Sequence, residues 1–117
     1  SNRENKSAVE KAKLQISEAE LEYLNAQKEL QKTIEDIYLD ATSSQAQYAA
    51  AIEQVKASKT SYNLAQEQFN LGMKNTVELL TEKNNFLSAQ QEMLQAKYMA
   101  ILNAQLLRFY QGKEITL

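Results

Sequence analysis

Apolar residues recur at seven-residue steps along most of the chain, as they do on the contact face of a coiled-coil helix. One such track consists of Val9, Ile16, Tyr23, Leu30 and Ile37, with Ala12, Ala19 and Ala26 three residues beyond its first members. A second track consists of Ala41, Tyr48, Val55, Tyr62 and Phe69, joined by Tyr38 and Ile52 on the adjoining edge. Because the apolar stripe moves around the helix, the run must supercoil or change neighbours along its length. We predict one helix over residues 4–70.

The last third of the chain carries two adjacent heptad tracks instead of one. The first is Leu80, Leu87, Leu94 and Ile101, widened by Val77 and Tyr98, and the second is Leu79, Phe86, Met93, Ala100 and Leu107. These tracks predict a second helix over residues 76–110 with two contact faces, which suits a helix flanked on both sides in a sheet of helices. A wide apolar face in a simple helical bundle produces the same pattern, and periodicity alone favours that interpretation.

A short break separates the two helical runs. Its residues are Leu71, Gly72, Met73, Lys74 and Asn75. Glycine tolerates the left-handed conformation that ends many helices, and the Asn75 side chain can cap the next helix while Glu78 reaches back as in a capping box. The sequence therefore predicts an all-α fold, a single long antiparallel helical hairpin over residues 1–117 with its tip at residues 71–75.

The predicted helices differ in length. The second is roughly half as long as the first, so folding back at the tip covers the first helix only from about Ser43 onward. Residues 5–40 are left without a partner. Apolar area left in water costs about 25 cal/mol per Å², so we expect a second copy or a missing segment to cover this stripe and the chain to self-associate.

Composition excludes several classes of function. The net charge is −2 without a basic run, which argues against nucleic acid as a partner. Cysteine and histidine are absent, which removes disulfides, thiol nucleophiles, zinc sites of the usual kind and the commonest general base. We therefore expect no catalytic site, no metal, no cofactor and no enzymatic activity. No apolar stretch approaches the roughly 20 residues of a membrane-spanning helix, so the chain itself is not expected to insert into a membrane.

The segment around the break, FNLGMKNTVELL, and the residues after it resemble the last helical hairpin of the TolC-like outer-membrane efflux proteins. The family pattern has an aromatic residue, a glycine, a short hydrophobic and acidic stretch, and a leucine-rich end closed by glycine. The matching residues are Phe69, Gly72, Val77, Glu78, Leu79, Leu80, Leu87, Ala89, Ala96, Tyr98, Leu106 and Gly112. The resemblance implies that the chain is a fragment of a larger outer-membrane channel protein.

The same resemblance implies an architecture and partners. In this family, three subunits build a hollow α-barrel that crosses the periplasm of the bacterial cell envelope, beneath a β-barrel in the outer membrane. The channel works with a periplasmic adaptor protein and an inner-membrane transporter, in type I secretion or multidrug efflux. Side-by-side packing in such a barrel would account for the two contact faces of the second helix and for the uncovered first half.

The resemblance also assigns roles to residues at the tip. Residues 71–75 would form the adaptor-docking surface and close the periplasmic end of the channel. Lys74 matches a position that is often basic and that tethers neighbouring hairpins. Phe69 matches an aromatic position that is often tyrosine. Because phenylalanine has no hydroxyl, Phe69 cannot supply the hydrogen bond of a polar lock. Glu78 matches an acidic constriction position, with capping as its alternative role. Thr81 stands where some members carry a second acid.

A second interpretation is an interaction module. The chain would then be the coiled-coil hairpin of the periplasmic adaptor itself, or an unrelated dimerisation stalk. An adaptor hairpin is expected to have helices of similar length, whereas the two helices predicted here are unequal. The full reading frame would separate the two interpretations, because a channel alternates two such helical segments with amphipathic β-hairpins.

Overall fold

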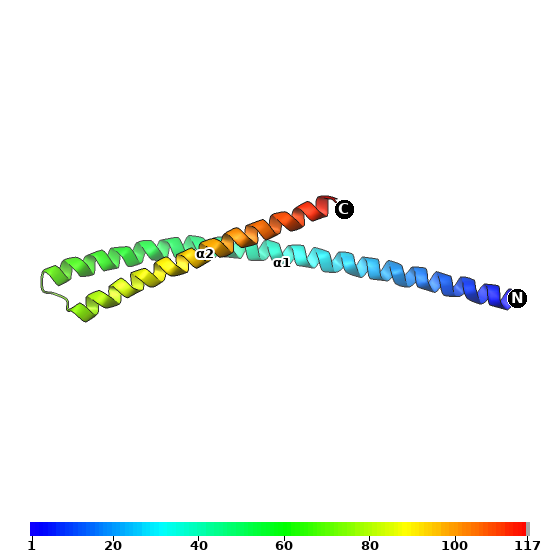
Figure 1. The fold of residues 1–117 in the computed structure, drawn as a ribbon, viewed down its shortest axis with the longest axis horizontal. Coiled ribbons are helices and arrows are strands. Elements are labelled where there is room, and N and C mark those ends of the chain that lie inside the picture. Colours follow the sequence, from blue (N-terminus) through cyan, green and yellow to red (C-terminus); the bar gives the residue numbers. More distant parts are fainter. Residues whose placement is uncertain (117) are drawn as a thin grey trace. The chain divides into compact units, whose positions relative to one another are not determined.

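The structure of the chain is a computed structural model that describes the backbone of residues 1–116 and the side chains through residue 112. Helix α1 spans Asn2–Asn70 and helix α2 spans Thr76–Thr116, and the described residues contain no strand. The absence of proline lets both helices run without interruption. Figure 1 shows α2 folding back from the tip along the later part of α1. The predicted all-α helical hairpin is confirmed.

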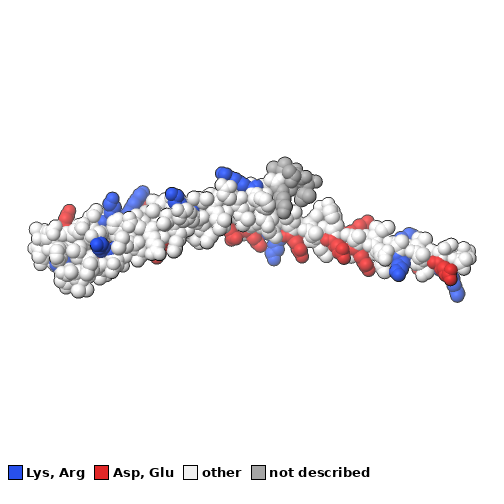
Figure 2. Space-filling view, viewed as in Figure 1, with Lys and Arg blue, Asp and Glu red and all other residues white. Residues whose placement is uncertain are grey.

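The chain divides into two units, and α1 belongs to both. The first unit, Ser1–Asp36, consists of α1 residues whose side chains are exposed, apart from those of Leu30 and Ile34, which are half-buried. Val9, Ile16 and Tyr23 of the predicted heptad track are each more than half exposed. Acidic side chains are frequent along this unit in Figure 2. The apolar heptad track is therefore open to solvent from Val9 to Tyr23.

The second unit begins at Ile37 and contains the hairpin. The two helices meet along a seam whose residues recur at alternating steps of four and three, the spacing of coiled-coil contact positions. On α1 the buried or half-buried seam residues are Ile37, Ala41, Ser44, Tyr48, Ala51, Val55, Ser58, Tyr62 and Ala65. On α2 they are Leu79, Glu82, Phe86, Ala89, Met93, Ala96, Ala100, Asn103, Leu107 and Tyr110. The second heptad track of α2 is therefore the one that packs on α1.

The seam is built largely from small side chains. Ala65 is fully buried, and Ala41, Ala89 and Ser44 are each 4% exposed. Among the large side chains, Tyr62 and Phe86 meet edge to face with ring centroids 5.9 Å apart. A pair of helices without a third layer buries little apolar area, so much of the apolar surface of this unit is left for other neighbours.

Two predicted boundaries need correction. Helix α2 continues past Tyr110 to Thr116, because Gly112 stays helical. Among the described residues, only Gly72 has the positive φ of a helix-ending glycine. The packed part of α1 begins at Ile37 rather than near Ser43. Both helices rise by about 1.5 Å per residue, so α2 residues up to Tyr110 already extend back to the level of Ile37.

Candidate functional site

The tip of the hairpin begins with a complete helix-ending motif. The N–H of Met73 donates to the Gln68 carbonyl at 2.8 Å, and the N–H of Gly72 donates to the Phe69 carbonyl at 3.0 Å. Gly72 has φ +76°, a left-handed value that glycine adopts without the penalty of a Cβ. These are the two hydrogen bonds of the Schellman motif. The end of α1 is therefore fixed by backbone hydrogen bonds.

The start of α2 is fixed by Asn75. The Glu78 N–H donates to Asn75 Oδ1 at 2.8 Å, and the Leu79 N–H donates to the Asn75 carbonyl at 3.2 Å. Asn75 is thus the N-cap, as the sequence predicts. Among the described residues, no hydrogen bond returns from the Glu78 side chain to Asn75, so only half of the expected capping box forms.

Three apolar side chains at or next to the tip are exposed. Leu71 is 76% exposed, Met73 is 69% exposed and Val77, in the first turn of α2, is 71% exposed. Lys74 is half-buried. Isolated exposed apolar residues are common on proteins, but three of them close together at the tip form an apolar surface that a partner can cover.

The structure places Lys74 in the tip and Phe69, Glu78 and Thr81 in the helical turns next to it, but does not join the four predicted gate residues. Phe69 is 38% exposed and, together with Leu79, lines a groove of about 600 Å³ beside the tip. Glu78 and Thr81 are exposed, and Thr81 Oγ1 donates to the Val77 carbonyl of its own helix at 2.9 Å. In the described part of the chain, no hydrogen bond or ion pair links Phe69, Lys74, Glu78 and Thr81 to one another.

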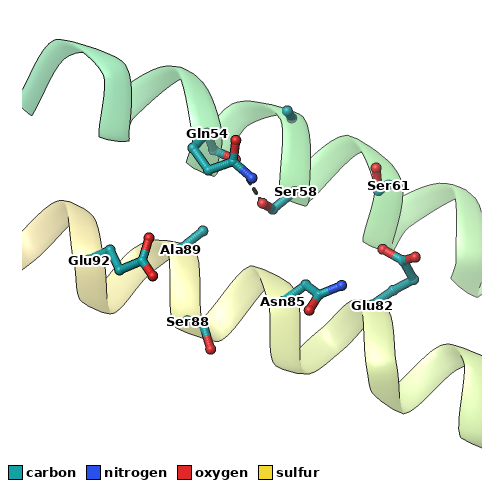
Figure 3. A pocket seen from close by; sticks show the side chains of 9 residues that line it. Gln54, Ser58, Ser61, Glu82, Asn85, Ser88, Ala89 and Glu92 are labelled. Atoms are coloured by element: carbon teal, nitrogen blue, oxygen red, sulfur yellow. Dashed lines mark hydrogen bonds between the residues drawn. The ribbon is translucent and has the colours of Figure 1, made fainter. Parts of the chain in front are cut away.

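A polar groove between the helices was not anticipated. It has a volume of about 330 Å³, and its polar lining consists of Gln54, Ser58, Ser61, Glu82, Asn85, Ser88 and Glu92. Figure 3 shows that these side chains come from facing turns of α1 and α2. The sequence did contain a signal for this position. Glu82 follows Leu79 by three residues, and Leu79 belongs to the heptad track of α2 that packs on α1, so the spacing places this acid at the seam.

The other heptad track of α2 lies open on the far side of the seam. Leu80, Leu87, Leu94 and Ile101 are each 48–52% exposed. Val77 and Tyr98, which widen this track, are more exposed still. In the view of Figure 2 the hairpin presents a surface with few charges. We call Leu80, Leu87, Leu94 and Ile101 the leucine face, and its exposure agrees with the prediction that α2 has two contact faces.

The described residues hold no group of three or more histidine, cysteine, aspartate or glutamate side chains placed to bind a metal ion. Over the same residues, neither helix has a stretch of the length and apolarity that crossing a lipid bilayer requires.

Comparison with known families gives one result. A family model described as "Outer membrane efflux protein" matches residues 2–113, which include both helices and the tip. Comparisons with curated proteins and with solved structures give no match.

Proposed function

Because the chain belongs to the outer membrane efflux protein family, whose members are transport channels of the bacterial envelope and not enzymes, we propose that it is a periplasmic helical hairpin of such a channel. Members of the family form trimeric channels that work with adaptors and inner-membrane transporters. In this proposal the chain contributes two neighbouring helices to the wall of the α-barrel and one tip to its periplasmic end.

The two contact faces of α2 support a place in the barrel wall. One face packs on α1, while the leucine face is about half exposed along its length. A helix in a closed ring of helices has a neighbour on each side, and heptad spacing on both sides gives each neighbour a continuous seam. In the intact channel, the leucine face would pack on the next helix of the ring.

The tip supports adaptor docking. Leu71 and Met73 are exposed, and the backbone that carries them is held by the Schellman motif before them and by the Asn75 cap after them. A surface that is ordered before binding loses little conformational entropy when a partner covers it. We therefore assign residues 71–75 to adaptor docking.

An exposed acid next to the tip supports a constriction at the end of the channel. The Glu78 side chain is exposed and takes no part in the cap, so its carboxylate is available to face a pore. Three copies of this carboxylate around a threefold axis would attract cations. Thr81 supplies no second charge, and Phe69 supplies no hydroxyl to a polar lock. In this proposal, Lys74 is the residue left to tether neighbouring hairpins at the tip.

Substitutions at the tip of the full-length protein test the docking assignment. Leu71→Asp and Met73→Asp place a charge on the exposed apolar tip without removing a seam contact. Leu64→Asp is the matched control, because Leu64 is also exposed, at 52%, but lies on α1 before the tip. We expect the two tip variants to lose export and adaptor crosslinking while the control keeps both. Unchanged crosslinking in both tip variants would remove the docking assignment.

A further inference from the structure

Helix α2 carries two apolar faces, and hydrophobicity does not decide which of them should pack on α1. The inner face contributes Leu79, Phe86, Met93, Ala100 and Leu107, whereas the leucine face contributes three leucines and one isoleucine. Both have seven-residue spacing, so both fit a seam of coiled-coil type. Besides the fit of small side chains, a polar contact made by one face alone can set the rotation of α2 about its own axis.

One polar contact crosses the seam at the end far from the tip. Asn103 Nδ2 donates to Ser44 Oγ at 3.1 Å and approaches the Asp40 carbonyl at 3.4 Å. Ser44 is 4% exposed, and its hydroxyl donates to the Asp40 carbonyl at 2.8 Å. Both hydrogen bonds connect the side chain of an α2 residue to an α1 residue.

A similar layer two heptads nearer the tip shows what this contact adds. Ser58 occupies the same heptad track as Ser44, is 7% exposed and donates to the Gln54 carbonyl of its own helix at 2.7 Å. The residue facing Ser58 is Ala89, and both side chains point into the space between the helices in Figure 3. A buried serine in this track is therefore satisfied without a partner on α2. Ser44 therefore does not need Asn103 as a hydrogen-bond partner. What Asn103 contributes is a contact that forms only when its own side of α2 faces α1.

Turning the leucine face toward α1 would break the contacts of Asn103. Asn103 would move to the outer side of α2 and lose its hydrogen bond to Ser44 and its approach to the Asp40 carbonyl. The Ser44 hydroxyl would keep its hydrogen bond to the Asp40 carbonyl of its own helix. The contacts of Asn103 therefore belong to the observed arrangement of α2 alone.

We propose that Asn103 is a positioning residue that selects which of the two apolar faces of α2 packs on α1, and so leaves the leucine face free for another helix. Asn103 is half-buried at a contact position of the seam, and a polar asparagine at such a position specifies alignment in coiled coils. The inference concerns the hairpin itself and does not depend on the proposed role in export.

Distance measurements between spin labels test this inference in the full chain, which contains no cysteine of its own. Labels attached through Ala46→Cys and Leu102→Cys lie at exposed positions of α1 and α2 near the polar contact, and position 102 belongs to neither apolar face of α2. Turning α2 about its axis would bring the label at position 102 toward α1 by up to about 10 Å, the diameter of a helix. Asn103→Ala removes the amide, and Asn103→Asp keeps its shape while an ionised carboxylate cannot donate to Ser44. Ser58→Ala is the matched control.

We expect one narrow distance in the labelled parent chain and in the Ser58→Ala control, and a second, shorter distance in Asn103→Ala and Asn103→Asp. Circular dichroism of each labelled protein checks that the helices are retained. If both Asn103 variants keep their helices and the single narrow distance, the inference is wrong. A second distance in Ser58→Ala would also overturn it, because any seam substitution would then loosen the hairpin.

Discussion

The backbone N–H of Glu78 donates to the side-chain oxygen of Asn75 at 2.8 Å, while the Glu78 side chain makes no hydrogen bond to Asn75 in the described part of the chain. Glu78 is therefore capped through its backbone rather than acting as a cap through its carboxylate. The sequence allows Glu78 to act as a cap or as a constriction residue. The structure separates these roles, because the cap uses the backbone N–H of Glu78 and not its carboxylate.

Replacing Asn75 should weaken the start of α2. Asn75→Ala removes the capping oxygen, and loss of an N-cap costs about 1 kcal/mol of the free energy of unfolding. Asn75→Asp keeps an acceptor at the same place and should leave the stability nearly unchanged. Urea unfolding followed by circular dichroism measures both variants, and equal midpoints for Asn75→Ala and the parent chain would contradict the prediction.

Replacing Glu78 should change the ion selectivity of the channel and leave the stability of the fold unchanged. Glu78→Gln keeps the backbone N–H that bonds Asn75, so we expect an unchanged unfolding midpoint. In single-channel recordings of the full-length protein, loss of three carboxylates at a constriction should lower the preference for cations. Glu92→Gln, at an acid far from the tip, is the control. Unchanged selectivity in Glu78→Gln would leave the residue without a role in the pore.

The two glycines should respond to alanine in opposite directions. A Cβ at either position meets no atom within 4 Å, so only backbone conformation distinguishes them. Gly72→Ala forces alanine into φ +76° and should destabilise the chain by about 1 kcal/mol, whereas Gly112→Ala, inside α2, should stabilise it by up to about 1 kcal/mol. Thermal unfolding that moves the same way in both variants would contradict this.

The contact between Tyr62 and Phe86 should be measurable as a coupling. Edge-to-face aromatic pairs contribute about 0.5–1.5 kcal/mol beyond the area that they bury. We expect a double-mutant cycle of Tyr62→Leu and Phe86→Leu, measured by urea unfolding, to give a coupling free energy in this range. A coupling near zero would show that the two rings contribute only through burial.

The chain should self-associate in solution. The exposed leucine face and the exposed heptad track at Val9, Ile16 and Tyr23 together leave a long apolar surface in water. Sedimentation over a series of concentrations should show oligomers, and Leu87→Ser with Leu94→Ser should shift the chain toward monomer. The control is Gln90→Ser with Gln95→Ser, at two exposed polar positions of the same helix. Monomer alone at every concentration would contradict the prediction.

Most of the fold and the position of the tip could be predicted from residue types and their spacing along short stretches of the chain. Gly72 and Asn75 end one helix and begin the next through hydrogen bonds that span a few residues, so their roles follow from residue types and spacing. The sequence predicts that α2 ends near Tyr110, whereas the helix continues to Thr116, because Gly112 resembles a helix stop but stays helical. A glycine permits a left-handed conformation without requiring it.

By itself the sequence determined two helices, the tip between them and the presence of two apolar faces on α2, because these depend on contacts between residues close in the chain. The tertiary structure alone decided which face packs inward, how far along α1 the seam runs, and that Asn103 meets Ser44 across 59 residues of sequence. Periodicity fixes the faces of a helix but not its rotation against a neighbour. That rotation is chosen by which side chains find complementary partners on the other helix.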